Sequence, residues 1–346
     1  MRLAGRSVGA GAPVYVIAEA GVNHNGDAGL ARALVEAAAV AGADAVKFQC
    51  FSAERLVSPR APKARYQTET TGADESQLEM LRRLELADDV VADLAGLARA
   101  RGLHFLATPF DDEALGLLIT LGVPAIKVGS GEITNLPFLA AIGRTALPVI
   151  LSTGMSTLGD VEDAVAALRG AGTEQLILLH CVSCYPAAAE ELNLRAIPTL
   201  ARAFHCPAGF SDHSRGLHAA VAAVALGACV IEKHFTLDRD LPGPDHRASL
   251  RPDELAAMIA SIRDTERALG DGIKRPVARE AEVARAARRS VVAVAALPAG
   301  TALTPAMLAI RRPGTGIPPA AWADVLGRRT RRDVGGGEIL QWEDLA

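Results

Sequence analysis

The chain has 346 residues, of which 50% are hydrophobic, and a formal net charge of −4 at pH 7. This length allows a large domain with a small second one, and the slight negative charge offers no basic surface to nucleic acid or an anionic membrane. Glu, Lys or Gly interrupts each apolar stretch well before the roughly 18 residues of a membrane-spanning helix, and no signal-peptide pattern opens the chain. Five cysteines, mostly within predicted strands, suit reduced thiols. The composition therefore predicts a soluble cytoplasmic protein.

Eight apolar runs of strand length recur along the first two thirds of the chain, separated by stretches with helical spacing. The runs are 14–20, 45–50, 104–110, 125–131, 148–154, 176–182, 208–214 and 229–236. They lack strict alternation, which is typical of parallel strands buried on both faces. Strand and helix in repeated alternation predict an α/β fold of the (β/α)8 TIM barrel type. An open doubly wound sheet is the alternative, but no Gly-x-Gly-x-x-Gly follows the first run, so a dinucleotide site has no support.

Polar residues gather where each run ends, which is the edge that carries the active site in (β/α)8 barrels. In chain order they are Glu19, Lys47, Gln49, Thr108, Lys127, Ser130, Glu132, Ser152, Thr153, His180, Ser183, Tyr185, Ser211, His213, Lys233 and His234. Lysines in apolar strands are costly to bury unpaired, and two at comparable places suggest a shared anion. Hydroxyls and glycine-rich turns supply donors for phosphate or carboxylate oxygens. A structural salt bridge, Lys47 with Glu19 for instance, explains one pair but not this succession of clusters.

Two histidines close the last two runs, in Gly209-Phe210-Ser211-Asp212-His213 and Glu232-Lys233-His234. Residues 216–228 between them predict a helix, so both imidazoles are expected at the same end of neighbouring strands. Such a pair suits a divalent metal or acid–base chemistry. Either histidine alone is more simply interpreted as a structural residue at the end of a strand, with its hydrogen bonds made within the protein. Their pairing, with Asp212, Glu232 and Gly243-Pro244-Asp245-His246 nearby, favours a site.

Three other segments carry weaker signals. The insertion 52–88, with Tyr66 and a helix opening at residues 75–79, is interpreted equally well as a lid over the site or as a solvated loop with a surface helix. Cys181-x-x-Cys184 has a redox or zinc spacing, but without a second cysteine pair it is interpreted as packing. The charged stretch 275–289 predicts an exposed connecting helix, and short strands and turns follow it. We therefore expect a barrel domain over 1–270, a linker over 271–289 and a small β-rich domain over 290–346.

The motifs together resemble those of the sialic acid synthases. They are Ile17-Ala18-Glu19-Ala20-Gly21-Val22-Asn23-His24-Asn25-Gly26, Lys47-Phe48-Gln49, Thr108-Pro109-Phe110, Lys127-Val128-Gly129-Ser130-Gly131-Glu132, Leu151-Ser152-Thr153-Gly154-Met155, His180-Cys181-Val182-Ser183-Cys184-Tyr185-Pro186, Gly209-Phe210-Ser211-Asp212-His213, Glu232-Lys233-His234-Phe235-Thr236 and Gly243-Pro244-Asp245-His246. The match runs in family order from about Val14 to the C-terminus. The resemblance implies condensation of phosphoenolpyruvate with an N-acetylmannosamine-type sugar and water, giving a nine-carbon 2-keto acid, N-acetylneuraminate in the first instance, and phosphate.

The resemblance also implies roles for individual residues. His213 and His234 would hold a divalent metal, and only two protein ligands make Mn²⁺ or Mg²⁺ more suitable than a closed zinc site. Phosphoenolpyruvate would be bound by Lys47, Thr108, Lys127, Ser130, Ser152, Ser183 and Ser211. The sugar would be bound by Gln49, Tyr185, Asp245 and Arg312, and the candidates for moving protons or positioning water are Glu19, Glu132, Tyr185 and Asp245. The choice of general base among these carboxylates stays open.

The C-terminal part resembles the antifreeze-like (SAF) domain that ends this family. The resemblance implies a homodimer in which this domain reaches the partner barrel and lends Arg312, although an arginine before a Pro-Gly turn is most often simply solvated. One departure concerns Ser183, where many N-acetylneuraminate synthases carry Asn. It leaves the sugar open, because N,N'-diacetyllegionaminate and pseudaminate synthases share nearly all the other motifs.

Two alternatives come from other functional classes. A Schiff-base aldolase could use Lys127 or Lys233 as its nucleophile on the same barrel, without need of the two histidines. A non-catalytic carbohydrate-binding protein could use the C-terminal domain as its binding module. The succession of polar clusters argues against the second.

Overall fold

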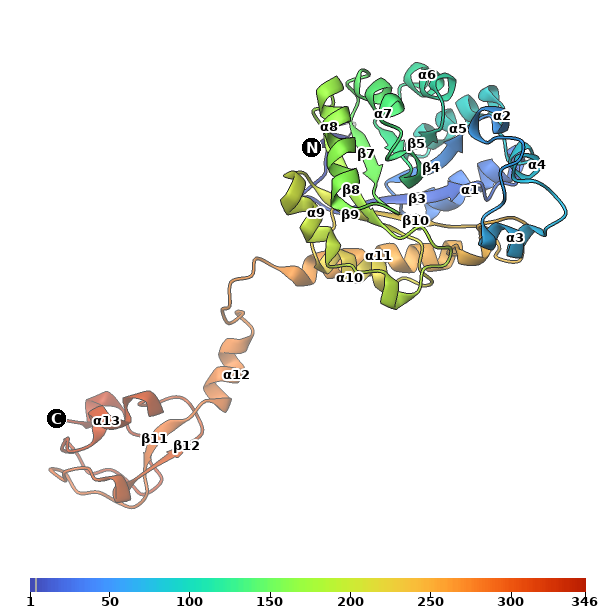
Figure 1. Ribbon diagram of the computed structural model, residues 1–346. Helices are drawn as coiled ribbons and strands as arrows, with labels where there is room; N and C mark the ends of the chain where they lie inside the picture. Colours follow the sequence, from blue (N-terminus) through green and yellow to red (C-terminus); the bar gives the residue numbers. More distant parts are fainter. Residues whose placement is uncertain (4) are drawn as a thin grey trace. The chain divides into compact units, whose positions relative to one another are not determined.

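The computed structural model describes residues 1–3 and 5–346 and divides into two compact units, Met1–Gly270 and Asp271–Ala346 (Figure 1). Eight parallel strands form the sheet of the first unit. They are β3 (Tyr15–Gly21), β4 (Ala45–Cys50), β5 (His104–Pro109), β6 (Ile126–Val128), β7 (Val149–Ser152), β8 (Leu176–Cys181), β9 (Ala208–Asp212) and β10 (Val230–His234). Their order is β5-β4-β3-β10-β9-β8-β7-β6, and β5 also lies against β6, which closes the barrel. Each expected run overlaps one strand, and only β3 extends a residue beyond its run, so the (β/α)8 prediction is confirmed.

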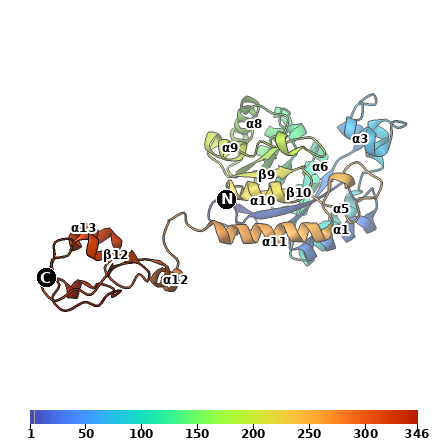
Figure 2. The same ribbon diagram turned by 90° about the horizontal axis from the view of Figure 1, so that it is seen from below.

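Eight helices alternate with the strands and surround them. They are α1 (Ala28–Ala41), α5 (Asp88–Ala100), α6 (Asp112–Leu121), α7 (Leu136–Gly143), α8 (Leu158–Ala171), α9 (Ala196–Phe204), α10 (His218–Ala225) and α11 (Pro252–Leu269). In α1 the buried residues Leu34, Val35 and Ala38 form one stripe toward the sheet. Asp27 caps its first turn by accepting from the Leu30 amide. Helices α1 and α11 lie side by side (Figure 2).

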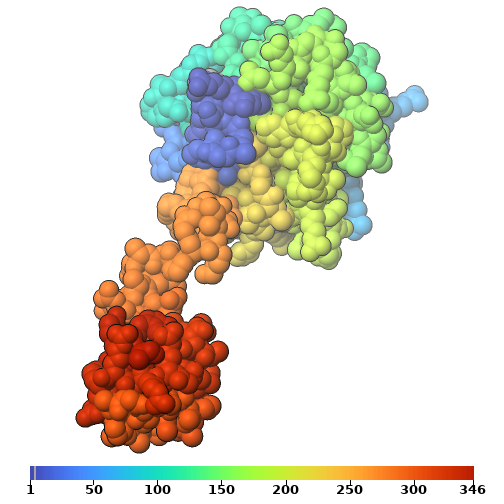
Figure 3. All heavy atoms as spheres, turned by 90° about the vertical axis from the view of Figure 1, so that its left-hand side faces the viewer, coloured from blue at the N-terminus to red at the C-terminus, as the bar shows by residue number. Residues whose placement is uncertain are grey.

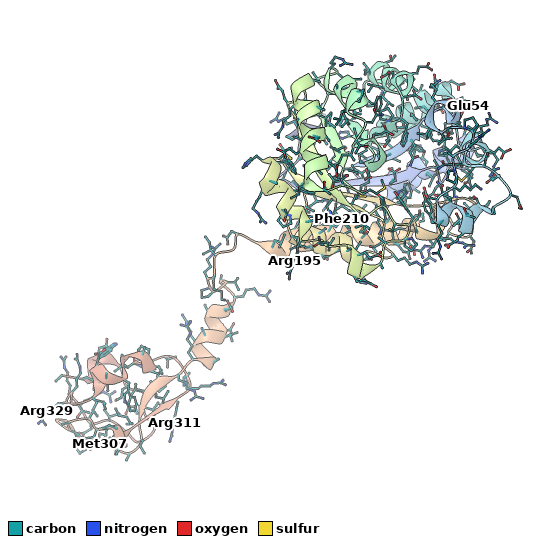
Figure 4. All side chains as sticks on the ribbon, in the orientation of Figure 1. Glu54, Arg195, Phe210, Met307, Arg311 and Arg329 are labelled. Atoms are coloured by element: carbon teal, nitrogen blue, oxygen red, sulfur yellow. The ribbon has the colours of Figure 1, made fainter. Side chains whose placement is uncertain are left out.

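Alternation along each strand sends one set of side chains outward to the helices and the other into the barrel. Phe210 on β9, labelled in Figure 4, packs outward in the main hydrophobic cluster, whereas its neighbour Ser211 faces the interior cavity. Away from that cavity the interior is filled by apolar side chains such as Ile17 and Leu106. An N-terminal hairpin of β1 (Arg2–Leu3) and β2 (Arg6–Ser7) adds Leu3 to this cluster. The sequence analysis did not anticipate this hairpin.

The insertion after β4 forms three short helices, α2 (Ala53–Leu56), α3 (Arg65–Thr71) and α4 (Gln77–Arg82). The expected helix opening at residues 75–79 is confirmed, because Ser76 and Glu79 make a reciprocal capping box at the start of α4. Leu78, Met80 and Leu81 of α4 are buried in a small cluster with Val22 and Ala53. The insertion is therefore a packed element with its own apolar core.

The second unit begins with α12 (Glu280–Ala287), which covers only part of the helix expected over 275–289, and no residue of α12 is buried. Strands β11 (Ser290–Ala293) and β12 (Leu308–Arg311) pair antiparallel, and α13 (Trp322–Val325) follows. Their core includes Val291, Leu303, Ile317, Val325 and Leu340. The end of the chain, in red, packs into a compact group of atoms (Figure 3). Over the described ranges 1–3 and 5–346, no helix is long and apolar enough to cross a membrane.

Candidate active site

A cavity of about 470 Å³ opens at the carboxyl ends of the barrel strands, a size typical of small-molecule sites. It brings together most of the residues that the sequence singled out. Those lining it are Glu19, Lys47, Gln49, Thr108, Lys127, Ser130, Ser152, Ser183, Tyr185, Ser211, His213 and His234. They come from strands far apart in the chain, so the barrel itself assembles the cluster.

The floor of the cavity, which we define as Glu19, Lys47, Thr108, Lys127, Ser152, Ser211 and Glu232, is charged and almost fully buried. Lys47 Nζ lies 2.5 Å from Glu19 Oε2 and donates to Thr108 Oγ1 at 3.1 Å. Lys127 Nζ donates to Ser152 Oγ at 2.8 Å and lies 3.5 Å from Glu232 Oε1. The salt bridge of Lys47 with Glu19 thus exists, but inside a larger network.

The pKa values of the two lysines move in opposite directions. Burial acts to lower the pKa of Lys47, but Glu19 and Glu232 outweigh it and raise that pKa above its usual 10.5. Burial prevails at Lys127 and lowers its pKa despite Glu232. Burial also raises the pKa of Glu19 to about 7 against the pull of Lys47. The floor is therefore a balanced set of charges that an incoming anion can rearrange.

Glu232 is a floor residue that the sequence analysis did not assign to the site. Its Oε1 accepts from Ser211 Oγ at 3.0 Å, and its Oε2 lies 3.9 Å from Lys47 Nζ. The signal was present in the strand pattern, because Glu232 and His234 are two residues apart and must face the same side of β10. Ser211, expected to hold phosphoenolpyruvate, donates its hydroxyl proton to Glu232 in this structure.

The two histidines stand side by side, with ring centroids 5.5 Å apart. His213 Nδ1 lies 2.7 Å from the Val182 carbonyl oxygen, a contact that makes Nδ1 the protonated nitrogen and leaves Nε2 with its lone pair. His234 Nδ1 is buried without a hydrogen-bond partner among the described residues. Burial first, and then His213 and Lys47, lower the pKa of His234 well below its usual value. Burial acts to lower the pKa of His213 as well, but Cys181 and the Val182 carbonyl outweigh it and raise that pKa above 6.5. The neutral form of each ring has a lone pair to offer, and His234 is the one held in that form.

The donor set fits a metal ion that is only partly held by protein. Within residues 1–3 and 5–346 no group of three or more His, Cys, Asp or Glu side chains is arranged to enclose a metal. A closed four-ligand zinc site is therefore absent from this part of the chain. A Cβ on Gly21 would stand 3.0 Å from Glu19 Oε1 and 3.4 Å from His234 Nδ1. Glycine, at φ +54°, keeps the space beside the orphaned nitrogen clear.

Three predicted site residues do not line the cavity. Glu132 lies in the 3-10 turn Ser130–Glu132, where its carboxylate accepts from Asn135 Nδ2 at 2.7 Å. Asp245 is buried next to the site, with a pKa that burial raises to about 6 against the effect of His213. Arg312 is exposed on the C-terminal unit. The geometry of the barrel thus gives no direct support to a role for Glu132.

Two further residues differ from their sequence interpretation. Cys181 was interpreted as packing, yet it lines the cavity, and its Sγ lies 3.6 Å from His213 Nδ1. Lys233 faces away from the cavity, where it pairs with Asp212 at 2.8 Å with both side chains fully buried. The structure therefore contradicts Lys233 as the nucleophile of a Schiff-base aldolase, because the barrel alternation turns it outward.

The insertion forms the roof of the cavity, which we define as its lining residues Leu56, Val57, Ala64, Tyr66, Gln67, Gln77 and Leu81. Tyr66 stacks on Tyr185 with ring centroids 4.9 Å apart, and Tyr185 lies 4.1 Å from the His213 ring. Lys63 holds α3 in place, since its Nζ contacts Thr71 Oγ1, the Gly72 carbonyl and Glu75 Oε1. Of the two interpretations of the insertion, a cover over the site is the one that the structure supports.

Comparison with known proteins gives concordant results. Residues 34–274 match the NeuB family, and residues 288–346 match the SAF domain. The N,N'-diacetyllegionaminic acid synthase of Campylobacter jejuni is 46% identical over 328 residues, covering 94% of this chain and 98% of the relative. The enzyme of that name from Legionella pneumophila is 44% identical over 335 residues, covering 96% and 94%. A crystal structure of N-acetylneuraminic acid (sialic acid) synthetase from Leptospira borgpetersenii in complex with citrate superposes with a TM-score of 0.73 at 36% identity, covering 82% of this chain and 94% of that one.

Proposed function

Because the chain belongs to the NeuB family and ends in a SAF domain, we propose that it condenses phosphoenolpyruvate with an N-acylated amino sugar to give a nine-carbon 2-keto acid and phosphate. The observation that carries this proposal is the juxtaposition of Lys47 and Lys127 with the two neighbouring histidines His213 and His234 in one cavity. Two buried cations suit a substrate with a phosphate and a carboxylate, and the histidines suit a cation that acts on the second substrate.

The phosphoenolpyruvate subsite rests on the floor and on one glycine turn. Lys47 and Lys127 would take the phosphate and carboxylate oxygens, with Thr108, Ser152 and Ser211 as further donors. Ser130 Oγ accepts from the Gly154 amide at 2.9 Å, and a Cβ on Gly154 would collide with Ser130 Oγ and Ser183 Oγ. The close packing at Gly154 thus holds the hydroxyls of Ser130 and Ser183 at the cavity wall.

The reaction needs a carbon–carbon bond, a water and a leaving phosphate. C3 of phosphoenolpyruvate attacks the sugar aldehyde carbon, whose oxygen takes up the electron pair and a proton. Water adds to the resulting cationic C2 and loses a proton, and cleavage of the C–O bond releases phosphate and leaves the 2-keto group. Mn²⁺ or Mg²⁺ bound by His213 and His234 would supply Lewis-acid polarisation of the aldehyde oxygen. Glu19 and Glu232 are the carboxyls that line the cavity, and Asp245 lies buried beside it, so these three are the candidates to position water or carry protons.

The acceptor sugar has two candidates. N-acetylmannosamine follows from the motifs, and the N,N'-diacetylated deoxy sugar that leads to legionaminic acid follows from two relatives at 44% and 46% identity. The identity to those relatives favours the diacetylated sugar. Ser183 departs from the pattern of many N-acetylneuraminate synthases and leaves the choice between the two sugars open.

We also propose that the working unit is a cytoplasmic homodimer in which the SAF domain of one chain serves the barrel of the other. Residues 288–346 match the SAF domain, and the C-terminal unit that contains them has its own hydrophobic core.

A phosphate-release assay tests the function directly. Phosphoenolpyruvate is mixed with the purified protein, a divalent cation and, in turn, N-acetylmannosamine, its 6-phosphate and N,N'-diacetylated deoxy sugars. Release that needs both substrates, together with a 2-keto acid product, supports a synthase. Trapping of pyruvate on Lys127 by borohydride, without any need for metal, would instead identify a Schiff-base aldolase.

A further inference from the structure

One ion pair lies directly behind the two histidines of the cavity. Lys233 on β10 and Asp212 on β9 are partners in the parallel register of these strands, and each directly precedes one histidine, His234 or His213. Lys233 Nζ lies 2.8 Å from Asp212 Oδ2, and both side chains are closed off from solvent. Because neighbouring residues of a strand point to opposite faces, the pair stands outside the barrel wall while the imidazoles line the cavity.

The pair also holds the residue that follows His213. Lys233 Nζ donates to the Ser214 carbonyl oxygen, while Asp212 Oδ1 accepts from the Ser214 amide at 2.8 Å and from its hydroxyl at 2.6 Å. The residues before and after His213 are therefore bonded to each other and to the residue before His234. We call Asp212, Ser214 and Lys233 the clip.

The clip acts where the strands themselves stop supporting the site. Lys233 and Asp212 are the last partners in the register of β9 and β10, which ends where the histidines begin. His213 has a further anchor in the Val182 carbonyl, whereas His234 Nδ1 has no hydrogen-bond partner among the residues that the structure describes. The position of the His234 ring relative to His213 thus depends on packing and on the backbone that the clip fixes.

Stability alone gives a weak reason for the clip. A buried ion pair is expensive to desolvate, and apolar residues of similar volume often stabilise a fold as well or better. Directional bonds to both neighbours of His213 are what apolar residues cannot supply. We infer, on the basis of the proposed metal-assisted reaction, that Asp212 and Lys233 are positioning residues, which hold the two imidazoles at the separation that Mn²⁺ or Mg²⁺ requires. With only two protein ligands, the affinity of such an ion depends on this separation.

The test compares two nearly isosteric changes, Asp212→Asn and Asp44→Asn. Asp44 precedes β4 at the amino ends of the strands, away from the cavity, where it accepts from the Val16 amide at 2.8 Å and pairs with Arg263 at 3.1 Å. Each change thus removes a carboxylate that is bonded to a backbone amide and to a cation, and one amide oxygen cannot replace both carboxylate oxygens. Asp212→Asn should weaken Mn²⁺ binding by about 10- to 100-fold, and Asp44→Asn should leave it unchanged.

Mn²⁺ binding is measured on the full chain without substrates, from the electron paramagnetic resonance signal of the free ion. Thermal unfolding in chelator measures the stability of each variant apart from the metal. Ser214→Ala removes only one bond of the clip, the hydroxyl donated to Asp212, and should weaken Mn²⁺ binding less than Asp212→Asn does. If Asp212→Asn does not fold, unchanged Mn²⁺ binding in Ser214→Ala overturns the inference. At saturating Mn²⁺, the phosphoenolpyruvate KM of Asp212→Asn should equal that of the wild-type chain.

The outcomes separate the clip from the function on which it rests. A wild-type chain that binds neither cation and releases phosphate in excess chelator would refute the metal-assisted reaction, and the clip with it. Binding to the wild-type chain that persists unchanged in Asp212→Asn would leave the metal standing and overturn the clip. Equal losses of Mn²⁺ affinity in Asp212→Asn and Asp44→Asn would show that lower barrel stability, and not the position of the histidines, weakens binding.

Discussion

The floor and the roof of the same cavity are built in different ways. The floor residues sit on the parallel strands of the barrel sheet, and the exposure of Glu19, Lys47, Lys127 and Glu232 is between 1% and 4%. The roof residues sit on short helices and loops, where Leu56, Val57 and Leu81 belong to the small apolar cluster of the insertion. The Lys63–Glu75 ion pair and the stack of Tyr66 on Tyr185 are its further contacts. Rigid strands suit chemistry that tolerates little displacement, and a loop-borne roof suits a choice of substrate. The difference indicates that reaction type and acceptor preference can change independently.

The largest effect is expected at the histidines. Chelation should reduce turnover by about a thousandfold, because Lewis-acid assistance is worth several kcal/mol, and Mn²⁺ or Mg²⁺ should restore it. His213→Ala and His234→Ala should each prevent that restoration. Phosphate release with and without chelator measures the effect. Full activity in excess chelator would show that the reaction needs no metal and that the histidines have another role in the cavity.

The next largest effect is expected at Lys127. Lys127→Met should lower kcat/KM for phosphoenolpyruvate by about 30- to 4000-fold, since loss of a buried charge contact with a substrate costs roughly 2 to 5 kcal/mol. The acceptor KM should change little. Lys274→Met, which removes an exposed lysine, is the control. An effect on the acceptor KM alone would show that Lys127 binds the acceptor sugar and not phosphoenolpyruvate.

Besides the floor and the roof, an arginine from the C-terminal unit of the partner chain would be a third part of the cavity. If Arg312 serves the partner barrel, Arg312→Ala should reduce activity by about tenfold or more without unfolding either unit, because guanidinium contacts with a ligand are worth that much. Arg311→Ala, its exposed neighbour labelled in Figure 4, is the matched control. Mixing Arg312→Ala with His213→Ala under subunit exchange should recover part of the activity. Exchange without recovery would place the arginine's role within its own chain.

The smallest effect is expected at the anchor of the roof. Lys63→Met should raise the acceptor KM severalfold, since partly buried ion pairs contribute about 1 kcal/mol, and leave the phosphoenolpyruvate KM unchanged. Arg60→Met in the same insertion is the control. Arg83, with Lys63, lowers the pKa of Glu75 from 4.5 to about 2. The stabilisation is therefore complete above pH 4.5 and is lost only as the pH falls toward 2, so the titration of Glu75 should not make the acceptor KM of the wild-type chain vary with pH near neutrality.

The sequence predicted the barrel well because its strands carry a strong local signal, an apolar run that ends in a polar cluster. It predicted the floor less completely. Glu232 was named among the residues near the two histidines but received no role, because only the strand register shows that it and Lys233 face opposite sides of β10. The N-terminal hairpin was missed because Leu3 and Val8 become apolar anchors only when the barrel interior receives them.

The roof was the part that pattern alone could not resolve. Residues 52–88 have no periodicity that points toward a cavity, and the stack of Tyr66 on Tyr185 joins side chains more than a hundred positions apart in the chain. The capping box at Ser76 and Glu79 was legible, because it depends on neighbours in sequence. Local sequence signals thus predicted the start of α4, but only the tertiary packing shows that the insertion covers the cavity.

The outward-facing pair Asp212–Lys233 has a consequence for how this site can diversify. Asp212 precedes His213, Lys233 precedes His234, and the two are bonded at 2.8 Å with no solvent contact. Loss of either partner alone would leave an uncompensated charge in the wall that sets the spacing of the imidazoles. Among homologous sequences these two positions should therefore vary together or not at all, and joint replacement by apolar residues of similar volume should be the one viable route of drift.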